Sequence, residues 1–213
     1  MTQILFPAQK KYLEYYRKKG DELILEMEQF AIEHKVPILD WHSADFIEKL
    51  ILINKPERVL EIGTAIAYTT IRIARCLHKG SVIHSIEKSN DNIKIALENI
   101  EKSGVSKKIK LIQGDALSVM PQLNKKFDFI FLDADKEDYK RLFDYSMILL
   151  RKGGVIVVDN LLWHGYAASN RVPSKYNKST KHIRDFNRLF ILQQNLDSMI
   201  IPIGDGIGLG IKK

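Results

Sequence analysis

The stretch that decides the fold is Arg58-Val-Leu-Glu-Ile-Gly-Thr-Ala-Ile-Ala-Tyr-Thr-Thr70. Its first residues form an apolar run typical of a buried strand, the chain turns at Gly63, and an apolar periodicity predicts a helix over Ile66–His78. A strand, a tight turn at a glycine and a helix form the crevice in which α/β proteins bind nucleotide-like cofactors. Residues that complete a site around Gly63 are therefore expected at the ends of neighbouring strands.

Strands and helices alternate downstream of this stretch. The predicted strands are residues 58–62, 81–86, 108–113, 127–132 and 154–158, and the helices between them are residues 91–102, 116–123 and 139–150. Their nearly continuous apolar runs suit strands that are buried on both faces of a parallel sheet. The pattern predicts an α/β fold with a doubly wound, mostly parallel sheet.

The C-terminal part departs from this alternation. Asn170–Lys181 is polar and is expected to be a surface loop, and a helix is predicted over Ile183–Gln194. Two short strands, Met199–Ile203 and Ile207–Ile211, are separated by a glycine-containing turn. They predict an antiparallel hairpin at the end of the sheet.

The N-terminal part is predicted to be helical. Gln9–His34 forms one or two helices broken at Gly20-Asp21, and a further helix covers Ser43–Asn54. Val36–Leu39 between them is expected to be extended, because a residue before proline avoids the helical conformation. Neither a linker nor a repeat interrupts the chain. We expect a single domain over 1–213, with 1–54 as an N-terminal helical appendage.

Composition narrows the class of protein. With 45% hydrophobic and 28% charged residues, the chain is typical of a globular protein. It contains neither a membrane-length apolar run nor a signal-peptide pattern, and Cys76 is its only cysteine, so we expect a cytoplasmic protein without membrane attachment. The formal net charge of +7 favours an anionic partner, although a lysine-rich chain can carry such a surplus for solubility alone.

The turn at Gly63 limits which cofactor fits. A dinucleotide loop needs the pattern G-x-G-x-x-G, but Gly63 is followed by Thr, Ala, Ile and Ala, and the next glycine is Gly80. No Walker-type phosphate loop occurs in the chain either. The loop suits a ligand that carries an adenosine without phosphates, and S-adenosylmethionine (SAM) is such a ligand.

Polar residues at successive strand ends support this cofactor. Glu87 follows the second strand, where a carboxylate accepts hydrogen bonds from ribose hydroxyls, and Glu61 could hold the ammonium group of the ligand. Gly114-Asp115-Ala116 follows the third strand and could contact the adenine edge. Taken singly, Glu87 suits a surface charge and Asp115 a helix cap. Their common position at the carboxyl ends of the strands favours a cofactor site.

A second polar group ends the fourth and fifth strands. Asp133, Asp159 and Asn160 provide two carboxylates and an amide oxygen, the hard ligands that Mg²⁺ or a similar cation prefers. The alternative is a pair of helix-capping acids. A metal there would lower the pKa of a substrate hydroxyl, and Lys136 would accept the proton if burial lowers the pKa of its amine. The alternative for Lys136 is a surface lysine paired with a neighbouring acid.

These motifs together resemble those of the metal-dependent O-methyltransferases, the family of the catechol and caffeoyl-CoA methyltransferases. The motifs are Val59-Leu-Glu-Ile-Gly-Thr64, Gly114-Asp-Ala116, Leu132-Asp-Ala-Asp-Lys136, Val158-Asp-Asn160 and Ile203-Gly-Asp-Gly-Ile207. The resemblance covers about His34 to Lys212. It implies a seven-stranded class I methyltransferase fold, a homodimer, and transfer of the SAM methyl group to a metal-bound hydroxyl oxygen.

Within the family, His34-Lys-Val-Pro-Ile38 and Ile200–Ile207 look most like a bacterial branch that includes the tRNA 5-hydroxyuridine methyltransferase. The resemblance implies that Asp133, Asp159 and Asn160 hold the metal. It implies that the cofactor is lined by Leu39, Thr69, Glu87, Asp115, Ala116 and Asp133. The family usually has Gly where this chain has Ala67, which adds a methyl group beside the cofactor loop.

The acceptor is predicted from the segment Arg171–Arg188. Six basic residues against one acid, together with Tyr176, would suit a phosphate backbone and a stacked base. The alternative is a solvated lid over a small hydroxyaromatic substrate. This segment and the resemblance to the bacterial branch together imply a Mg²⁺-dependent methyltransferase that converts 5-hydroxyuridine at the tRNA wobble position to 5-methoxyuridine. A small-molecule catechol or hydroxycinnamoyl methyltransferase is the first alternative, and a non-catalytic adenosyl-ligand or RNA-binding module is the second.

Overall fold

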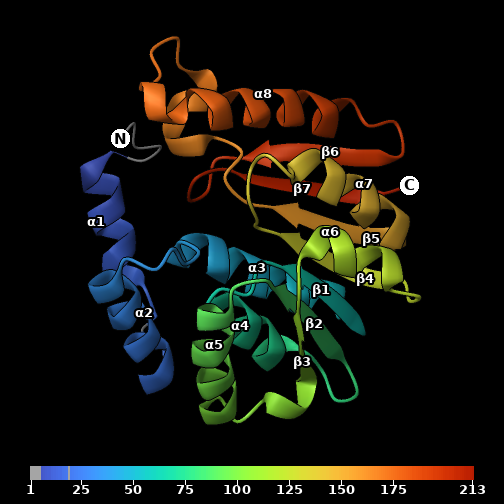
Figure 1. Cartoon of the computed structure of the whole chain (residues 1–213). Helices are drawn as coiled ribbons and strands as arrows, with labels where there is room; N and C mark the ends of the chain where they lie inside the picture. Colours follow the sequence, from blue (N-terminus) through green and yellow to red (C-terminus); the bar gives the residue numbers. More distant parts are fainter. Residues whose placement is uncertain (1–5, 19) are drawn as a thin grey trace.

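The computed structural model of the protein describes residues 6–18 and 20–213. Its centre is a seven-stranded sheet in the order β3-β2-β1-β4-β5-β7-β6 (Figure 1). Strands β1 to β5 are parallel, whereas β7 runs antiparallel to both β5 and β6. The strands are β1 Arg58–Ile62, β2 Val82–Glu87, β3 Ile109–Gln113, β4 Phe127–Leu132, β5 Leu150–Val158, β6 Leu196–Ile201 and β7 Ile207–Lys212. The predicted doubly wound α/β fold with a C-terminal antiparallel hairpin is confirmed.

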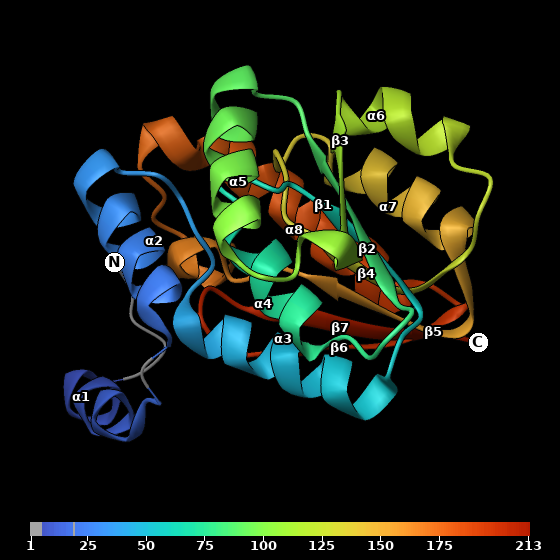
Figure 2. The ribbon, with the colours of Figure 1, turned by 90° about the horizontal axis from the view of Figure 1, so that it is seen from below.

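Helices cover both faces of this sheet (Figures 1 and 2). Helices α2 to α5 pack with one face, and α6 to α8 pack with the other. The helices are α1 Pro7–Tyr16, α2 Glu22–His34, α3 Trp41–Asn54, α4 Tyr68–Cys76, α5 Asn90–Lys102, α6 Ala116–Val119, α7 Tyr139–Leu149 and α8 Asn177–Leu192. Short 3-10 turns cover Ser106–Lys108, Met120–Gln122, Trp163–Ala168 and Ser174–Tyr176.

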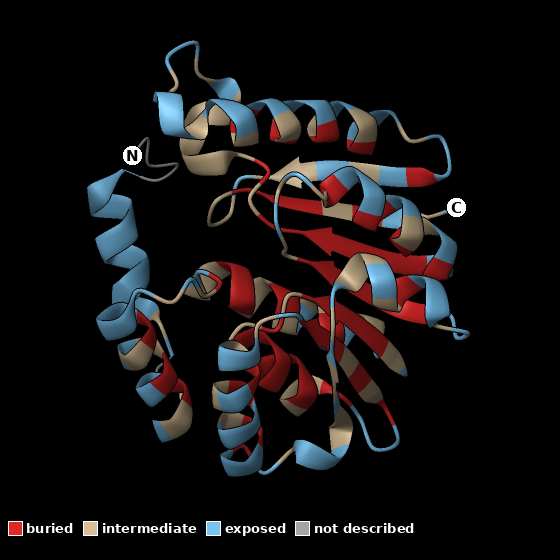
Figure 3. Ribbon diagram, in the orientation of Figure 1, coloured by how far each residue is buried: buried red, intermediate tan, exposed pale blue. Residues whose placement is uncertain are grey.

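Strand β4 shows how the sequence sets the sheet. All six of its residues are buried (Figure 3). From Phe129 to Leu132, successive side chains enter opposite core clusters. Phe129 and Phe131 pack towards α3 and α4, whereas Ile130 and Leu132 pack towards α7 and α8. A shift of one residue would exchange the two sets, so burial on both faces fixes the register. Leu132 consequently pairs with Val158, and Asp133 and Asp159 follow at adjacent strand ends.

The structure corrects several predicted boundaries. Helix α8 begins at Asn177, so the expected loop to Lys181 is partly helical, because Thr180 already packs in the interior. Helix α4 begins at Tyr68 instead of Ile66, because the residues before it have positive φ angles. The helix after β3 stops at Val119, and Pro121 lies in a 3-10 turn.

The segment predicted as one or two helices over Gln9–His34 contains two separate helices, α1 and α2. Asp21 caps α2 by accepting a hydrogen bond from the Ile24 N–H, which confirms the predicted break at Gly20-Asp21. Helix α2 packs through Ile24, Met27 and Ala31, whereas α1 buries no residue and lies apart from the sheet in Figures 1 and 2. Within the part of the chain that the structure describes, no helix is long and apolar enough to cross a membrane.

Candidate active site

The turn after β1 lies against the end of β4. Gly63 has a φ of +100°, and a Cβ atom placed on it would lie 1.9 Å from the carbonyl oxygen of Asp133. The N–H groups of Gly63 and Thr64 donate to the carbonyl of Ile86, at 3.0 and 3.2 Å. Glycine is therefore required at position 63, both for its left-handed backbone and for this close approach. The turn fixes the expected cofactor loop next to a predicted metal ligand.

Two alanines in the same loop adopt the left-handed backbone. Ala65 has a φ of +49° and Ala67 a φ of +70°. Ala67 is fully buried and forms the N-cap of α4. An L-residue in this conformation costs roughly 1–2 kcal/mol. The conformation explains why a glycine is expected at position 67, and it shows that Ala67 retains the loop geometry at a cost in strain.

Glu61 lies beneath the cofactor loop and does not line the pocket. Thr70 and Ser85 donate hydrogen bonds to its Oε2, the latter at 2.6 Å. Its Oε1 is buried and has no hydrogen-bond partner in the described part of the structure. Burial raises the pKa of Glu61 to about 8, although both hydrogen bonds oppose the shift. Glu61 was expected to hold the ammonium group of the ligand, but its buried position beneath the loop keeps it out of the pocket.

A pocket of about 860 Å³ lies above this loop, at the carboxyl ends of the parallel strands. Its volume falls in the range of small-molecule and cofactor sites. Nine predicted site residues line it: Gly63, Glu87, Gly114, Asp115, Ala116, Asp133, Lys136, Asp159 and Asn160. Leu39 and Thr69 are buried and do not line the pocket, whereas Pro37 and Ile38, which were not predicted, do.

Glu87 joins the two loops that flank this pocket. One of its carboxylate oxygens accepts a hydrogen bond from the Ala65 N–H and the other from the Ser89 N–H, both at 2.8 Å. The side chain is nearly buried but lines the pocket. Each carboxylate oxygen can accept more than one hydrogen bond. Glu87 thus holds the loop geometry and still has acceptor capacity for a ligand hydroxyl.

The other side of the pocket is built around Lys136. Its Nζ donates to Asp133 Oδ1 at 3.0 Å and to the Tyr139 hydroxyl at 2.8 Å. Tyr139 in turn donates to the main-chain carbonyl of Asp159 at 3.0 Å. This chain of contacts links the ends of β4 and β5, so the structure brings Asp133, Lys136 and Asp159 together as the sequence predicted.

The ionisation of these groups differs from the expectation. Burial disfavours the Lys136 ammonium, but Tyr139 and Asp133 outweigh it and raise the pKa of Lys136 above its usual range. Burial, followed by the charge of Asp133, raises the pKa of Asp159 well above its ordinary value. Lys136 is therefore a cation that holds Asp133 in this arrangement. The predicted role of Lys136 as a base required a lowered pKa of its amine, whereas the pKa is raised.

The turn between β6 and β7 contributes a residue that the sequence did not assign. Asp205 accepts a hydrogen bond from Asn160 Nδ2 at 3.4 Å and another from the His164 N–H at 2.5 Å. Asn160 itself has a φ of +64°. Val158 at the end of β5 pairs with Gly208 near the start of β7, which places this turn beside Asn160. The polar residue within Gly204-Asp-Gly206 was the available signal for this contact.

The donors around Asp159 fit a hard divalent cation. Asp159 Oδ1 is buried without a hydrogen-bond partner, and its carboxylate is destabilised by burial and by Asp133. A cation would relieve both costs, and Asn160 lies next to it in the chain. The described residues form no cluster of three His, Cys, Asp or Glu side chains suited to a metal. A site of two carboxylates and an amide remains a prediction.

An aromatic cluster lies at one side of the pocket, which it reaches through Trp163. Trp163 lines the pocket, with Lys136 Nζ 5.8 Å from the centre of its ring. Tyr166 and Tyr176 stack with ring centres 5.3 Å apart, and Tyr176 meets Trp163 edge to face at 6.1 Å. A planar ring would find apolar walls here.

Two of the six predicted phosphate-binding cations are engaged in intramolecular hydrogen bonds or ion pairs. Arg184 donates to the main-chain carbonyls of Tyr166, Ala167 and Ser169. Lys178 pairs with Glu137 at 2.7 Å. The remaining four are Arg171, Lys175, Lys181 and Arg188.

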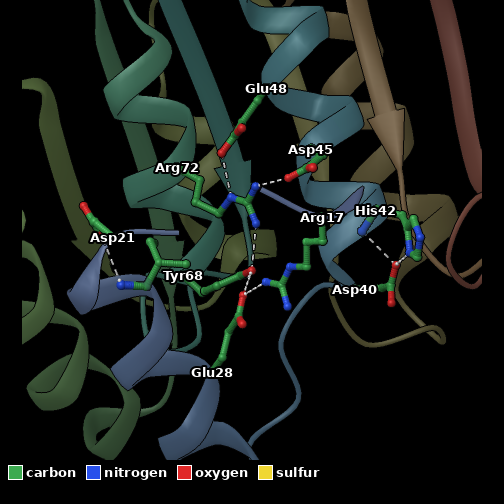
Figure 4. Close-up of polar contacts among 10 residues, drawn as sticks. Arg17, Asp21, Glu28, Asp40, His42, Asp45, Glu48, Tyr68 and Arg72 are labelled. Atoms are coloured by element: carbon green, nitrogen blue, oxygen red, sulfur yellow. Dashed lines mark hydrogen bonds and ion pairs between the residues drawn. The ribbon is translucent and has the colours of Figure 1, made fainter. Parts of the chain in front are cut away.

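A polar network holds the start of α4 against the N-terminal helices (Figure 4). The Tyr68 hydroxyl donates to Glu28 of α2 at 2.6 Å and accepts from Arg72 at 2.7 Å. Arg72 also binds Glu48 and Asp45 of α3. Tyr68 directly follows the cofactor loop, so these contacts help to position that loop. No local pattern in the sequence indicates this network, because its members come from three helices.

A doubly wound sheet with its pocket at the carboxyl ends of the strands, a single glycine turn and an acidic residue at the end of β2 is typical of a class I methyltransferase. The chain matches the O-methyltransferase family over residues 13–213. It is 31% identical over 172 residues to the caffeoyl-CoA O-methyltransferase of Populus kitakamiensis, covering 77% of this chain and 73% of that protein. It is also 31% identical over 170 residues to tapetum-specific methyltransferase 1 of Arabidopsis thaliana, with the same coverage.

Solved structures show the same similarity. An O-methyltransferase from Bacillus cereus in complex with SAH superimposes with a TM-score of 0.85 and 28% identity, covering 97% of each chain. TomG from Streptomyces achromogenes, an O-methyltransferase of tomaymycin synthesis in complex with SAM, superimposes with a TM-score of 0.86 and 25% identity, covering 100% of this chain and 99% of TomG. The chain belongs to the O-methyltransferase family and is a SAM-dependent O-methyltransferase.

Proposed function

We propose that this enzyme methylates a hydroxyl group on a small hydroxyaromatic ring that carries a second oxygen beside it. The observation that carries the proposal is the convergence of Asp133, Lys136, Asp159 and Asn160 on one side of the pocket that Gly63 and Glu87 line on the other. A cofactor methyl group and an acceptor oxygen can meet between these two sides. Positioning of this kind supplies much of the rate enhancement when the methyl group is already activated.

The residues of the chain have separate tasks in this proposal. Glu87 accepts hydrogen bonds from the ribose hydroxyls of SAM, and Asp115 contacts its adenine base. Lys136 keeps Asp133 oriented through their 3.0 Å contact, and its positive charge stabilises the oxyanion that remains when the acceptor hydroxyl releases its proton to solvent. Trp163 excludes water from one wall. Asp133, Asp159 and Asn160 would hold a divalent ion, which when bound supplies Lewis-acid stabilisation of negative charge on the acceptor oxygen.

Two observations support a small aromatic acceptor. The relatives at about 31% identity include enzymes named for caffeoyl-CoA, whose caffeoyl part is a dihydroxylated ring. The loops at the carboxyl ends of the strands also contain eight acidic residues and two lysines. The loops counted are 63–67, 87–90, 114–116, 133–138, 159–165 and 202–206. Such a charge balance disfavours a phosphodiester chain immediately at the pocket.

The second candidate acceptor is 5-hydroxyuridine in tRNA, which also presents adjacent oxygens on a planar ring. Tyr176 in the aromatic cluster beside the pocket favours it, because this ring could stack on a base, and Lys175 lies 4.7 Å from its centre. Arg171, Lys175 and Lys181 are exposed nearby. They are not engaged by acids in the described structure and are available to phosphates.

The test is methyl transfer from radiolabelled SAM to three acceptors: a catechol, the matching monohydroxy ring, and tRNA that contains 5-hydroxyuridine. We expect the catechol to accept the methyl group and the monohydroxy ring to fail, because only the former presents two adjacent oxygens. Transfer to tRNA without transfer to a catechol would replace the proposal with the second candidate. If neither accepts while SAM still binds, both proposals are wrong.

A further inference from the structure

The edge of the sheet opposite the pocket carries most of the excess positive charge. We define this amino edge as the segments that enter the parallel strands and β6, together with the end of β7. These segments are residues 55–58, 78–82, 103–110, 123–128, 150–154, 193–197 and 212–213. They contain twelve lysines and arginines against three acids. Their net charge is +9, so the rest of the chain is −2 within a total of +7.

The topology brings these segments together. Arg58 at the start of β1 pairs with Val82 of β2, and His84 of β2 pairs with Lys110 of β3. Because β7 is antiparallel, Lys212 at its end pairs with Leu196 at the start of β6. Charges that are distant in sequence therefore line one edge of the molecule, where the C-terminus lies at the right of Figures 1 and 2.

The cations of this edge influence one another. Burial lowers the pKa of His84, and Lys110, Lys125 and Arg58 add to the shift through their charges. Burial lowers the pKa of Lys212 as well, and Lys126 and Lys152 contribute in the same direction. Side chains from separate loops therefore share common regions of positive potential. Like charges held this close oppose folding, so solubility alone does not account for their segregation.

Most of these charges are exposed and lack an acidic partner. Nine of the twelve are exposed: Lys55, Lys79, Lys107, Lys110, Lys125, Lys126, Arg151, Lys152 and Lys213. Among the described residues, Arg151 is the only one of the twelve in an ion pair, with Asp128 at 2.5 Å. Lys126 donates to the carbonyl of Ile148 at 2.6 Å, and the ammonium groups of the other exposed lysines are available to an external anion.

We propose that the amino edge is a binding surface for the phosphate backbone of RNA. Seven strands spaced about 4.8 Å apart make an edge roughly 29 Å long, enough to face several consecutive phosphates. Flexible lysines suit such a backbone because they meet phosphates as point charges without reading sequence. The inference goes beyond the proposed function and holds for either acceptor, because the edge lies at the opposite strand ends from the pocket.

The composition of the edge favours RNA over a membrane surface. Stable membrane association needs an apolar or lipid anchor in addition to basic residues. Among the described residues, no large exposed hydrophobic side chain lies within an amino-edge segment, and the nearest ones, Ile53, Ile148, Leu192 and Ile211, belong to four different elements. A surface of this kind is held by charge alone, as in sequence-independent nucleic-acid binding.

The experiment compares two triple variants of equal net charge. The edge variant carries Lys110→Gln, Lys125→Gln and Lys152→Gln. The control variant carries Lys49→Gln, Lys94→Gln and Lys140→Gln, exposed positions on α3, α5 and α7. Fluorescence anisotropy measures binding of a labelled RNA duplex without modified nucleosides across a KCl series. We expect the edge variant to bind at least tenfold more weakly, with a log–log salt slope smaller by about 2–3, and the control to change less than threefold.

Equal weakening in the two variants would overturn the proposal, because net charge alone would then explain RNA binding. A wild-type protein without measurable RNA affinity would overturn it as well. An edge variant that loses affinity for phosphatidylserine vesicles and keeps its RNA affinity would assign the surface to a membrane instead. Thermal unfolding verifies that both variants fold. Methyl transfer to a catechol, measured on the same samples, tests the proposed function separately, because it is expected to be unchanged in both.

Discussion

The two edges of the sheet differ in charge and in how well their polar groups are satisfied. The loops at the carboxyl edge carry eight acids against two lysines, whereas the amino edge carries twelve basic residues against three acids. The carboxyl edge also holds five non-glycine residues with positive φ: Ala65, Ala67, Asn160, Trp163 and His164. The other two described residues of this kind, Lys35 and Lys55, are helix C-caps.

Buried polar atoms follow the same division with one exception, His84 Nδ1, which is buried without a partner beside the amino-edge cations in the described part of the structure. Glu61 Oε1, Asp159 Oδ1 and Trp163 Nε1 are buried without partners at or beneath the carboxyl edge. At the amino edge, Asp128 accepts hydrogen bonds from the N–H groups of Glu57 and Arg58, at 2.8 and 2.7 Å. Backbone strain and buried polar atoms without partners gather at the edge where a ligand can bind. At the opposite edge, the buried Asp128 is satisfied by hydrogen bonds within the protein.

The largest effect is expected from Gly63→Ala. The added Cβ would meet the Asp133 carbonyl at 1.9 Å, and the backbone would have to move at the point where the cofactor loop touches β4. We expect methyl transfer to fall more than about 100-fold, because small displacements of reacting groups have effects of that size. Calorimetric titration with SAM and the transfer assay measure the change. Gly153→Ala is the control at the amino edge, where an added Cβ meets nothing within 4 Å.

The next effect concerns the pH dependence of stability. The pKa of Glu61 is about 8 in the folded protein, against 4.5 for the ordinary carboxyl. Between these two pH values the folded protein keeps the Glu61 proton, whereas the unfolded protein has lost it. The contribution of Glu61 to the free energy of unfolding is therefore fully present below pH 4.5 and is lost as pH rises through 8. We expect the free energy of unfolding to fall by on the order of 4 kcal/mol between pH 5 and 8 in the wild type relative to Glu61→Gln. Urea unfolding of both proteins at each pH measures the difference, and parallel pH profiles would contradict it.

A smaller effect is expected from Tyr68→Phe, which removes the hydroxyl between Glu28 and Arg72. Loss of hydrogen bonds to charged groups should destabilise the protein by about 1–3 kcal/mol and weaken SAM binding a few-fold, because the network positions the cofactor loop. The matched control is Arg75→Gln, which breaks the more exposed pair between α4 and Asp21. That change should cost under about 1 kcal/mol and leave SAM affinity unaltered. Equal effects of the two changes on SAM affinity would show that Tyr68 has no positioning role.

The smallest effect is expected from Ala67→Gly. Glycine removes about 1–2 kcal/mol of left-handed strain. It also loses a buried methyl group and gains unfolded-state entropy, which together offset most of that amount. The unfolding free energy should change by less than about 1 kcal/mol. A gain of several kcal/mol in urea unfolding would mean that the strain at this edge is larger than the geometry indicates.

Much of the fold was predictable because its signals are local. Strand β4 is apolar at five of six positions and could only lie inside a sheet, and the register of β4 with β5 then places Asp133 beside Asp159. The turn at Gly63 was also predictable from a local signal, because an apolar strand run ends and a helical periodicity begins at this glycine. The start of α8 was not, because its first turn is polar and is stabilised by the tertiary packing of Thr180.

The parts of the site that were missed depend on contacts between distant segments. Asp205 reaches Asn160 only because β7 pairs with β5. The raised pKa of Lys136 results from Tyr139 and Asp133 acting together, and burial alone would have lowered it. Glu61 occupies the strand end that the sequence indicated, but its side chain points beneath the loop to Ser85. The positions of these residues in the chain showed which strand end each one occupies. Their contacts and pKa shifts depend on residues that only the folded structure brings near.

The central claim is that O-methyl transfer takes place at the carboxyl edge around Asp133, Asp159 and Asn160. Its most direct test is transfer of labelled methyl from SAM to a catechol by the wild type and Asp159→Asn, each with a chelator and after addition of Mg²⁺. We predict that wild-type activity is lost in chelator and returns with Mg²⁺, and that Asp159→Asn loses at least about 100-fold in kcat while binding SAM normally. Unchanged transfer in chelator, together with an active Asp159→Asn variant, would contradict the account.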